Sequence, residues 1–411
     1  MKTISCFVLI VCLAIGSATP VAKNIQCHDS SEETKDVSLP EILMTTVEMI
    51  EYHGYPAEEY EVQTDDGYVL KLHRIPHGKS GRSLRREQKV VFLQHGLLCS
   101  SADWVMMGPK EGLAFILADA GYDVWMGNAR GNTYSKKHIS LSTNDAKFWD
   151  FSWDEMGKHD LPAEIDFVLQ HTGKSDLFYA GHSMGTTMFY VMCAERPEYN
   201  AKIRAQFSLA PVAFMSRVQT PLRLLAPFID EIDWVMKMLG VNEFMPHSDL
   251  LDMIGLALCK DGAITQALCS DVLFLISGFD SKELNRTALP IITAHTPAGA
   301  STKTIVHYVQ EINSGKFRQY DYGRSGNEEK YGSSSPPEYD LSKITAPMYF
   351  HYGQNDLLAN VEDVEILYRT MPGTQGKFEV PFEKFNHLDF LWAIDAPDLL
   401  YYKMVGLMAR H

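Results

Sequence analysis

Residues 177–195 read Leu-Phe-Tyr-Ala-Gly-His-Ser-Met-Gly-Thr-Thr-Met-Phe-Tyr-Val-Met-Cys-Ala-Glu. The first four of these residues predict an apolar strand, and residues 186–195 predict a buried helix. Between them, Gly181-His182-Ser183-Met184-Gly185 matches the pattern Gly-x-Ser-x-Gly. The glycines are needed because so tight a turn from strand to helix leaves no room for side chains. The pattern predicts that Ser183 is an exposed nucleophile at the edge of a sheet.

The sequence on either side of this turn alternates between strand and helix patterns. Such alternation is typical of units in which helices connect neighbouring parallel strands. Upstream, residues 60–74 hold two runs rich in Tyr, Val and Leu around Asp65-Asp66-Gly67, a turn signal that favours a hairpin. The sequence therefore predicts an α/β fold with a mostly parallel central sheet. The predicted strands are 89–93, 122–126, 177–180, 207–212 and 347–352, and the predicted helices are 112–119, 161–169 and 186–195.

The alternation stops between about residues 214 and 335, where the sequence becomes helical and apolar. This stretch ends in a turn-rich linker at residues 332–337, with the sequence Gly-Ser-Ser-Ser-Pro-Pro. We expect residues 214–335 to form a helical cap, or lid, inserted into the α/β core. The core then consists of residues 20–213 and 336–411, and it ends with a helix after His387.

A serine hydroxyl is a poor nucleophile at neutral pH, so a base must take its proton. His387 is the candidate base, because it lies in a loop before a helix, downstream of the last predicted strand. The other downstream histidines fall in the expected cap, inside a strand or at the terminus; they are His247, His295, His307, His351 and His411.

The imidazole in turn needs a carboxylate that fixes its tautomer and stabilises the imidazolium ion. Asp356 is the candidate acid, because it follows the predicted strand 347–352 through a short turn. Asp340 precedes that strand, whereas Asp389 and Asp395 come after the base and are expected to cap or solvate the final helix. We expect the serine, the aspartate and the histidine to meet at one site.

Negative charge that develops on an ester carbonyl oxygen needs fixed N–H donors, each worth about 3 to 4 kcal/mol. The backbone N–H of Met184, directly after the serine, is the first candidate donor. The second is expected in the loop after the strand that ends near Gln94, where His95-Gly96-Leu97-Leu98 offers a glycine-loosened backbone. Leu97 is the candidate donor in that loop.

Composition excludes several classes of protein. With 411 residues, 45% of them apolar, the chain can bury a large core, which excludes disorder and collagen-like repeats. The formal net charge of −15 repels phosphate backbones, so nucleic acid is not expected as a partner. The chain has no Cys-x-x-Cys pair and no His-Glu-x-x-His element, so neither a metal nor another cofactor is expected.

Residues 1–19 have the pattern of a secretory signal peptide, with Lys2, an apolar run at 7–15 and then Gly16-Ser17-Ala18. That run is too short to span a bilayer, and no later run of about 18 apolar residues follows. We therefore expect a secreted protein without a transmembrane segment. Asn285-Arg286-Thr287 is a glycosylation sequon, which in a secreted chain predicts a surface loop.

Removal of this leader takes away two of the seven cysteines and leaves five, an odd number in an oxidising compartment. Cys259 and Cys269 are close in sequence and form the candidate disulfide. Cys193 lies on a strongly apolar stretch and is expected to pack as a small hydrophobic residue. The state of Cys27 and Cys99 stays open.

Several further motifs occur along the chain, from about residue 40 to residue 408. They are His53-Gly54-Tyr55-Pro56, Asp66-Gly67-Tyr68, Leu-Gln-His-Gly-Leu-Leu at 93–98, Asp-Val-Trp-Met-Gly-Asn-Ala-Arg-Gly-Asn at 123–132, Phe-Trp-Asp-Phe-Ser at 148–152, Gly278-Phe279-Asp280 and Asn-His-Leu-Asp-Phe at 386–390. With these motifs the chain resembles the animal acid lipase family, which includes gastric, lingual and lysosomal acid lipases. The resemblance implies an α/β-hydrolase core under a helical cap, no metal, and hydrolysis of triglycerides or cholesteryl esters.

The resemblance also implies roles for single residues. The family's nucleophile falls on Ser183, its acid on Asp356, its base on His387, and its oxyanion donors on Leu97 and Met184. Mammalian members often have Gln where this chain has Met184, a difference that should matter little because the backbone N–H acts. The paired cap cysteines of the family correspond to Cys259 and Cys269. Lysosomal members usually bear several sequons, so the single one here favours secretion.

We therefore expect a secreted serine lipase that hydrolyses neutral-lipid esters at an emulsion or membrane surface through an acyl-enzyme intermediate. Two alternatives stay open, a carboxylesterase for small soluble esters and a noncatalytic hydrolase-like protein that binds lipid. The complete set of serine, acid and base argues against the second alternative. The sequence identifies no protein partner.

Overall fold

The computed structural model describes residues 42–81, 88–224, 226–228, 236, 238–246, 274, 276–280 and 282–411. Three expectations from the sequence fall outside these residues: the leader at 1–19, the state of Cys27, and the disulfide between Cys259 and Cys269. Within the described ranges, no helix combines the length and the apolar character needed to cross a bilayer.

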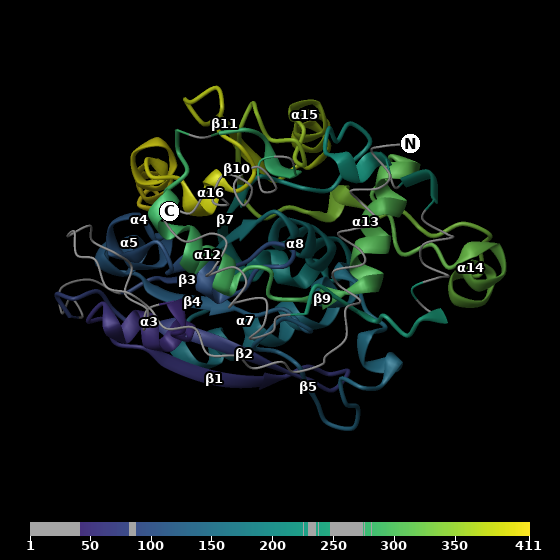
Figure 1. Cartoon of the computed structure of the whole chain (residues 1–411), viewed down its shortest axis with the longest axis horizontal. Helices are drawn as coiled ribbons and strands as arrows, with labels where there is room; N and C mark the ends of the chain where they lie inside the picture. The colour runs from purple at the N-terminus through teal and green to yellow at the C-terminus, as the bar shows by residue number, and fades with distance from the viewer. Residues whose placement is uncertain are drawn as a thin grey trace, which may run out of the picture.

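A nine-stranded sheet forms the centre of the molecule (Figure 1). Its strands lie in the order β1-β2-β4-β3-β6-β7-β10-β11, and the short β5 pairs with β2. From β4 to β11 all neighbouring strands are parallel, whereas β2 is antiparallel to both β1 and β4. The predicted α/β fold with a mostly parallel sheet is therefore confirmed. The strands are β1 (Glu58–Gln63), β2 (Tyr68–Ile75), β3 (Val90–Gln94), β4 (Asp123–Gly127), β5 (Lys137–His138), β6 (Leu177–His182), β7 (Ile203–Leu209), β10 (Met348–Tyr352) and β11 (Thr374–Glu379).

Helices pack on both sides of this sheet. Figure 1 shows α5 and the C-terminal helices on one side of the strands and α8 on the other. The central strands β3, β4 and β6 are buried along their whole length, as expected for apolar strands that are covered on both faces. The helices of the core are α3 (Thr46–Tyr52), α4 (Gly108–Glu111), α5 (Leu113–Asp119), α6 (Trp153–Glu155), α7 (Leu161–Thr172), α8 (Met184–Glu195), α15 (Val361–Thr370), α16 (Asp389–Trp392) and α17 (Tyr402–Met408).

Individual strands can be compared with the finer predictions from the sequence. The hairpin expected around Asp65-Asp66-Gly67 is present, because β1 and β2 pair as far as Gln63 and Val69. The strand expected at 207–212 is β7, which begins earlier and ends at Leu209, because the next residue, Ala210, turns the chain with a φ of 53°. Sequence patterns do not predict the edge strand β11, which is polar and only partly buried.

The described chain between residues 214 and 335 is mainly helical. Its helix α13 packs on the core: the Tyr308 hydroxyl donates to Thr187 Oγ1 at 3.1 Å, and the His307 ring stacks on Trp153 with ring centroids 3.7 Å apart. The cap boundaries at 214 and 335 stay a prediction. The elements here are β8 (Glu243–Phe244), α12 (Leu289–His295), β9 (Ala300–Ser301), α13 (Thr302–Ser314) and α14 (Gly323–Tyr331).

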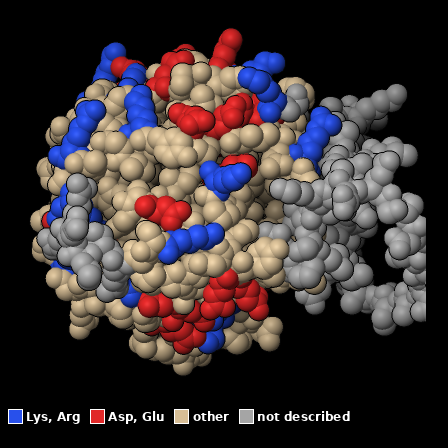
Figure 2. All heavy atoms as spheres, turned by 90° about the vertical axis from the view of Figure 1, so that its left-hand side faces the viewer, with Lys and Arg blue, Asp and Glu red and all other residues tan. Residues whose placement is uncertain are grey.

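Charged side chains of both signs are interspersed on the face shown in Figure 2. Arg130 differs from these surface groups, because only 1% of its side chain is exposed. Its guanidinium lies 2.6 Å from Oδ1 of the buried Asp160 and 2.6 Å from Oδ2 of Asp66. This ion network joins the β1–β2 hairpin to the segment after β4. The neighbouring residues Ala129 and Asn132 contact the loop after β3, so the network also supports that loop.

We expect Arg130→Met to lower the free energy of unfolding by about 3 to 5 kcal/mol, because it leaves the Asp160 carboxylate buried without its cation. Urea denaturation followed by tryptophan fluorescence measures the change. Arg324→Met is the matched control: that side chain is 86% exposed and pairs with Glu328, so its loss should cost less than about 1 kcal/mol. Equal losses in the two variants would contradict the assigned role of the buried network.

Candidate active site

A single residue, Ser183, makes the turn from β6 to α8. Its φ of 51° and ψ of −115° are rarely adopted by residues other than glycine. A Cβ atom at Gly185 would clash with the carbonyl oxygen of Gln94, and one at Gly181 would lie 2.7 Å from the Gly185 carbonyl. The two glycines of the motif are therefore required by the close approach of β3, β6 and α8.

Hydrogen bonds from neighbouring elements hold this turn. The backbone N–H of Ser183 donates to the carbonyl of Leu209 in β7 at 3.0 Å. The Thr186 hydroxyl donates to the carbonyl of Ser183 at 2.6 Å and accepts the N–H of Val212 at 2.9 Å. The serine is thus anchored to β7 and to its own helix, while its side chain stays partly exposed.

The Ser183 hydroxyl faces an imidazole, which in turn faces a carboxylate. Ser183 Oγ lies 2.7 Å from Nε2 of His387, and His387 Nδ1 lies 2.8 Å from Oδ2 of Asp356. The serine comes from the β6–α8 turn, the aspartate from the loop after β10, and the histidine from the loop before α16. The structure thus brings together the three residues selected from the sequence. His387 and Asp356 are both buried, with 3% and 4% of their surfaces exposed.

The hydrogen bonds around Asp356 determine where the protons lie. Its Oδ1 accepts the backbone N–H groups of Leu358 at 2.9 Å and Ala359 at 2.7 Å. Because an ionised carboxylate can only accept, the imidazole proton of His387 lies on Nδ1. The other ring nitrogen, Nε2, then accepts the hydroxyl proton of Ser183. This arrangement can deprotonate a serine and stabilise the imidazolium ion that results.

His182, the residue before the serine, supports the base through its backbone. Its Nε2 donates to the carbonyl oxygen of His387 at 2.8 Å. Burial, and to a smaller extent the electrostatic interaction with His387, hold the pKa of His182 well below its ordinary value, so the ring is neutral. The Gly-x-Ser-x-Gly pattern leaves this position unspecified, so the sequence does not reveal this role.

The loop after β3 passes directly against the serine. A Cβ atom at Gly96 would lie 3.2 Å from the Cβ of Ser183 and 2.9 Å from Nδ1 of His182, so the loop needs glycine there. Leu97, one predicted oxyanion donor, is the next residue. Met184, the other, begins α8, where backbone N–H groups have no partners within the helix. The chain therefore carries both predicted donors in segments that adjoin the serine.

His95 holds this loop in one orientation. Its Nδ1 donates to the carbonyl of Gly96 at 2.8 Å, and its Nε2 accepts the N–H of Ala129 at 3.1 Å. Burial lowers the pKa of His95 to about 4, so the ring is neutral. The carbonyl and the N–H of a trans peptide point in opposite directions, so fixing the Gly96 carbonyl directs the Leu97 N–H away from His95. Local sequence patterns do not reveal this support.

The remaining predicted site residues lie elsewhere. Asn285 is half-buried, and its side chain accepts the N–H of Ala288 at 3.3 Å; its glycosylation stays a prediction. Cys193 is a buried free thiol, as predicted, and so is Cys99. The disulfide between Cys259 and Cys269 cannot be compared, because both residues lie outside the described ranges.

The alternative acids do not face the imidazole. Asp340 accepts the N–H of Ser342 at 3.1 Å and caps a short helix before β10. Asp389 begins α16, but only 5% of its surface is exposed, so the expectation that it is solvated is wrong. Its carboxyl group interacts with Asp280, and Ser277 lines the same pocket as Asp389.

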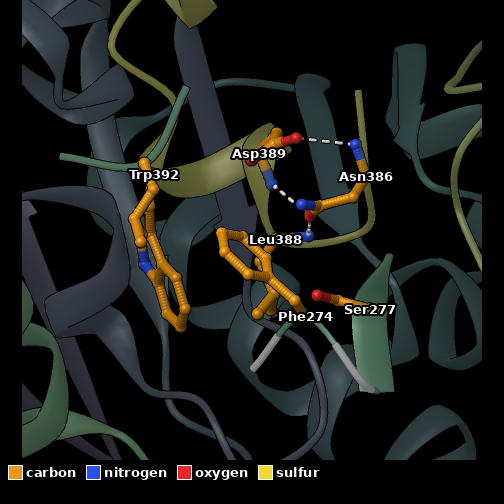
Figure 3. Close-up of a pocket in the computed structure, with 7 residues that line it drawn as sticks. Phe274, Ser277, Asn386, Leu388, Asp389 and Trp392 are labelled. Atoms are coloured by element: carbon orange, nitrogen blue, oxygen red, sulfur yellow. Dashed lines mark hydrogen bonds between the residues drawn. The ribbon is translucent and has the colours of Figure 1, made fainter. Parts of the chain in front are cut away.

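A small pocket lies beside the base loop, which we define as residues 386–389. Its apolar lining comes from Phe274, Leu284, Leu388 and Trp392. Figure 3 shows the polar part of the lining, where the backbone N–H of Asn386 donates to the Asp389 carboxylate at 2.6 Å. The side-chain oxygen of Asn386 accepts the N–H of Leu388 at 2.8 Å, so the base loop is bonded to itself as well as to its neighbours.

The close packing around Ser183 can be tested by adding a methyl group at residue 185. We expect Gly185→Ala to lower the free energy of unfolding by about 1 to 3 kcal/mol, because the added methyl group meets the rigid backbone of Gln94. Gly406→Ala is the matched control: it lies inside α17 with open space around it, and it should raise stability by about 0.5 to 1 kcal/mol. Thermal denaturation measures both changes, and a stabilising effect at residue 185 would contradict the packing described.

Comparison with known proteins agrees with this architecture. Residues 89–393 match the family model described as alpha/beta hydrolase fold, and residues 46–108 match a partial alpha/beta-hydrolase lipase region. Lipase 3 of Drosophila melanogaster is 46% identical, over 89% of this chain and 92% of that protein. Gastric triacylglycerol lipase of Rattus norvegicus is 42% identical, over 90% and 93% of the two chains.

Lysosomal acid lipase/cholesteryl ester hydrolase of Homo sapiens is also 42% identical, over 90% of this chain and 92% of that protein. Among solved structures, an acetylester hydrolase from Corynebacterium glutamicum has a TM-score of 0.51 at 16% identity and covers 88% of this chain and 97% of its own, which shows a shared fold. The family model and these relatives together show that the chain belongs to the α/β-hydrolase lipase family that includes the gastric and lysosomal acid lipases.

Proposed function

We propose that this lipase uses Ser183 as its nucleophile, His387 as its general base and Asp356 as the group that orients the base. The observation that carries the proposal is the unbroken hydrogen-bonded chain from Ser183 Oγ to His387 at 2.7 Å and on to Asp356 at 2.8 Å. Each bond has the donor and acceptor that the proposed role requires. The burial of the base and the acid keeps competing water away from them.

In the first step, His387 Nε2 takes the hydroxyl proton while Ser183 Oγ bonds to the ester carbonyl carbon. The electron pair of the carbonyl bond moves to its oxygen, which then accepts the N–H groups of Leu97 and Met184, each worth about 3 to 4 kcal/mol. The intermediate collapses, the bond to the alcohol oxygen breaks, and the imidazolium gives its proton to the leaving alcohol. Water repeats the sequence on the acyl-enzyme and releases the fatty acid.

The substrates proposed are carboxylic esters of neutral lipids, namely triglycerides, cholesteryl esters or both. The names of the relatives support this class, because one is a gastric triacylglycerol lipase and another a cholesteryl ester hydrolase. Such substrates form emulsions or lie in membranes, where the protein would bind peripherally. A carboxylesterase for small soluble esters is the alternative.

The proposed location is extracellular, with the lysosome as the alternative. The signal-peptide pattern at residues 1–19 and the sequon at Asn285 support passage through the secretory pathway. The gastric and lysosomal relatives are compatible with either destination. We also propose the helical cap at residues 214–335 and the disulfide between Cys259 and Cys269.

We expect Ser183→Ala to lower kcat on emulsified triglyceride and cholesteryl ester roughly 10⁴-fold or more, because the members of a triad act as a unit. Covalent labelling by a fluorophosphonate probe should be lost as well. Ser333→Ala, which changes an exposed serine in the linker, is the matched control and should behave like the wild type. Full activity in Ser183→Ala would contradict the proposed nucleophile, and activity on soluble short-chain esters alone would favour the carboxylesterase.

Asp356→Asn separates the role of charge from that of shape. The amide keeps an oxygen for the N–H groups of Leu358 and Ala359, but it disfavours the tautomer of His387 that accepts the serine proton. We expect kcat to fall roughly 10⁴-fold while the melting temperature changes little. Asp340→Asn, at an exposed helix cap, should leave kcat unchanged. A kcat for Asp356→Asn within about 10-fold of the wild type would rule out the proposed acid.

A further inference from the structure

Residues 277–280, which we call the strap, form hydrogen bonds both with the loop after β10, which holds Asp356, and with the base loop. The carbonyl of Ser277 accepts the N–H of Leu357 at 3.3 Å and that of His387 at 3.4 Å. The Asn386 side chain donates to the carbonyl of Gly278 at 3.1 Å. A Cβ atom at Gly278 would lie 3.0 Å from the Cβ of Asn386, so the strap and the base loop pack closely. The position of the base therefore depends on how firmly the strap is held.

Two buried carboxyl groups meet where the strap ends. Asp280 is completely buried, and 5% of Asp389 is exposed. Asp280 Oδ1 accepts the backbone N–H groups of Lys282 at 3.0 Å and Glu283 at 3.3 Å, but Oδ2 meets no donor in the described part of the chain. Asp389 and Ser277, the first residue of the strap, line the same pocket, and the carboxyl group of Asp389 interacts with that of Asp280. A proton on either group would supply the missing donor.

The charges around the pair oppose the loss of that proton. Among the described residues, the titratable and charged groups in this region besides the pair itself are Glu283, Lys282, Asp395 and Asp103, which lies in η1 (Ser101–Trp104). His387 lies two residues before Asp389 in the base loop. The Lys282 ammonium lies over the Phe382 ring, 4.9 Å from its centroid, and so has a partner of its own. Burial, and then the Asp280 and Glu283 charges, raise the pKa of Asp389 from 3.8 to about 8. Two buried carboxylates in contact cannot both ionise without strong repulsion.

We propose that Asp280 and Asp389 share one proton, and that the resulting carboxyl–carboxylate hydrogen bond fixes the base loop to the strap. The inference rests on the proposed function, because it treats both aspartates as positioning residues for His387 and gives them no contact with substrate. Loss of the shared proton puts two negative charges in contact, which loosens the base loop and separates His387 from Ser183.

The direction of the pH effect follows from linkage. The pKa of Asp389 is higher in the folded protein than its ordinary value of 3.8, so folding favours the protonated form. The stabilisation is fully present below pH 3.8 and declines as the pH rises toward about 8. Hydrolysis should therefore fall on the alkaline side as the pair loses its shared proton.

The test is the pH dependence of kcat for Asp389→Asn, Asp389→Ala and the wild type on emulsified triglyceride. The amide accepts the Asn386 N–H and donates to Asp280 without ionising, so its alkaline limb should move upward by roughly 1 pH unit or more. Asp389→Ala removes the bond, and its kcat should fall roughly 100-fold with KM much less affected. Asp398→Asn, an exposed carboxyl group in the next helical segment, should keep the wild-type profile.

Coincident alkaline limbs for Asp389→Asn and the wild type would overturn the proposal. Asp280→Asn places the amide donor on the other member of the pair and should move the alkaline limb upward in the same way. Failure of both amide variants to fold would also contradict the shared proton. Fluorophosphonate labelling of Ser183 distinguishes failure of this inference from failure of the proposed function. Loss of labelling in Ser183→Ala with coincident limbs overturns only this inference, whereas retained hydrolysis in Ser183→Ala overturns the proposed function.

Discussion

The single-residue turn at Ser183 is the constraint on which the rest of the site depends. A backbone with φ of 51° is unfavourable for serine, and it persists because surrounding elements leave the chain no alternative. Glycines at 96, 181 and 185 let the β3 loop, β6 and α8 approach one another more closely than any other residue would allow. Because these elements pack so closely, the hydroxyl group of Ser183, the N–H of Met184 and the loop that holds Leu97 lie in adjoining segments.

The base is held in a different way from the nucleophile. His387 lies in an irregular loop, so its position comes from bonds to other segments: its carbonyl accepts from His182 and its N–H donates to Ser277. Asp356 fixes the imidazole itself. The nucleophile is thus positioned by backbone packing, whereas the base is positioned by hydrogen bonds from three parts of the chain. A site built in this way is sensitive to the protonation of groups that never contact a substrate.

Sequence patterns predict the parts of this site that have local causes. A strand, a helix and two glycines identify Ser183, and a position after a strand selects Asp356. The supporting residues escape prediction because their partners are remote: His95 accepts an N–H from 34 residues away, and His182 binds a carbonyl 205 residues away. The edge strand β11 escapes for another reason, since its polar sequence lacks the apolar run of the central strands. The motif Gly278-Phe279-Asp280 is visible in the sequence, but its place beside the base loop is not.

The most direct measurement of the central claim is a crystal structure of the protein after reaction with a long-chain alkyl fluorophosphonate. The account predicts a phosphorus atom bonded to Ser183 Oγ, with the phosphoryl oxygen about 2.7 to 3.1 Å from the backbone nitrogens of Leu97 and Met184. It also predicts that His387 Nε2 remains beside the modified oxygen. A phosphorus atom on another residue, or a phosphoryl oxygen that faces away from both nitrogens, would contradict it.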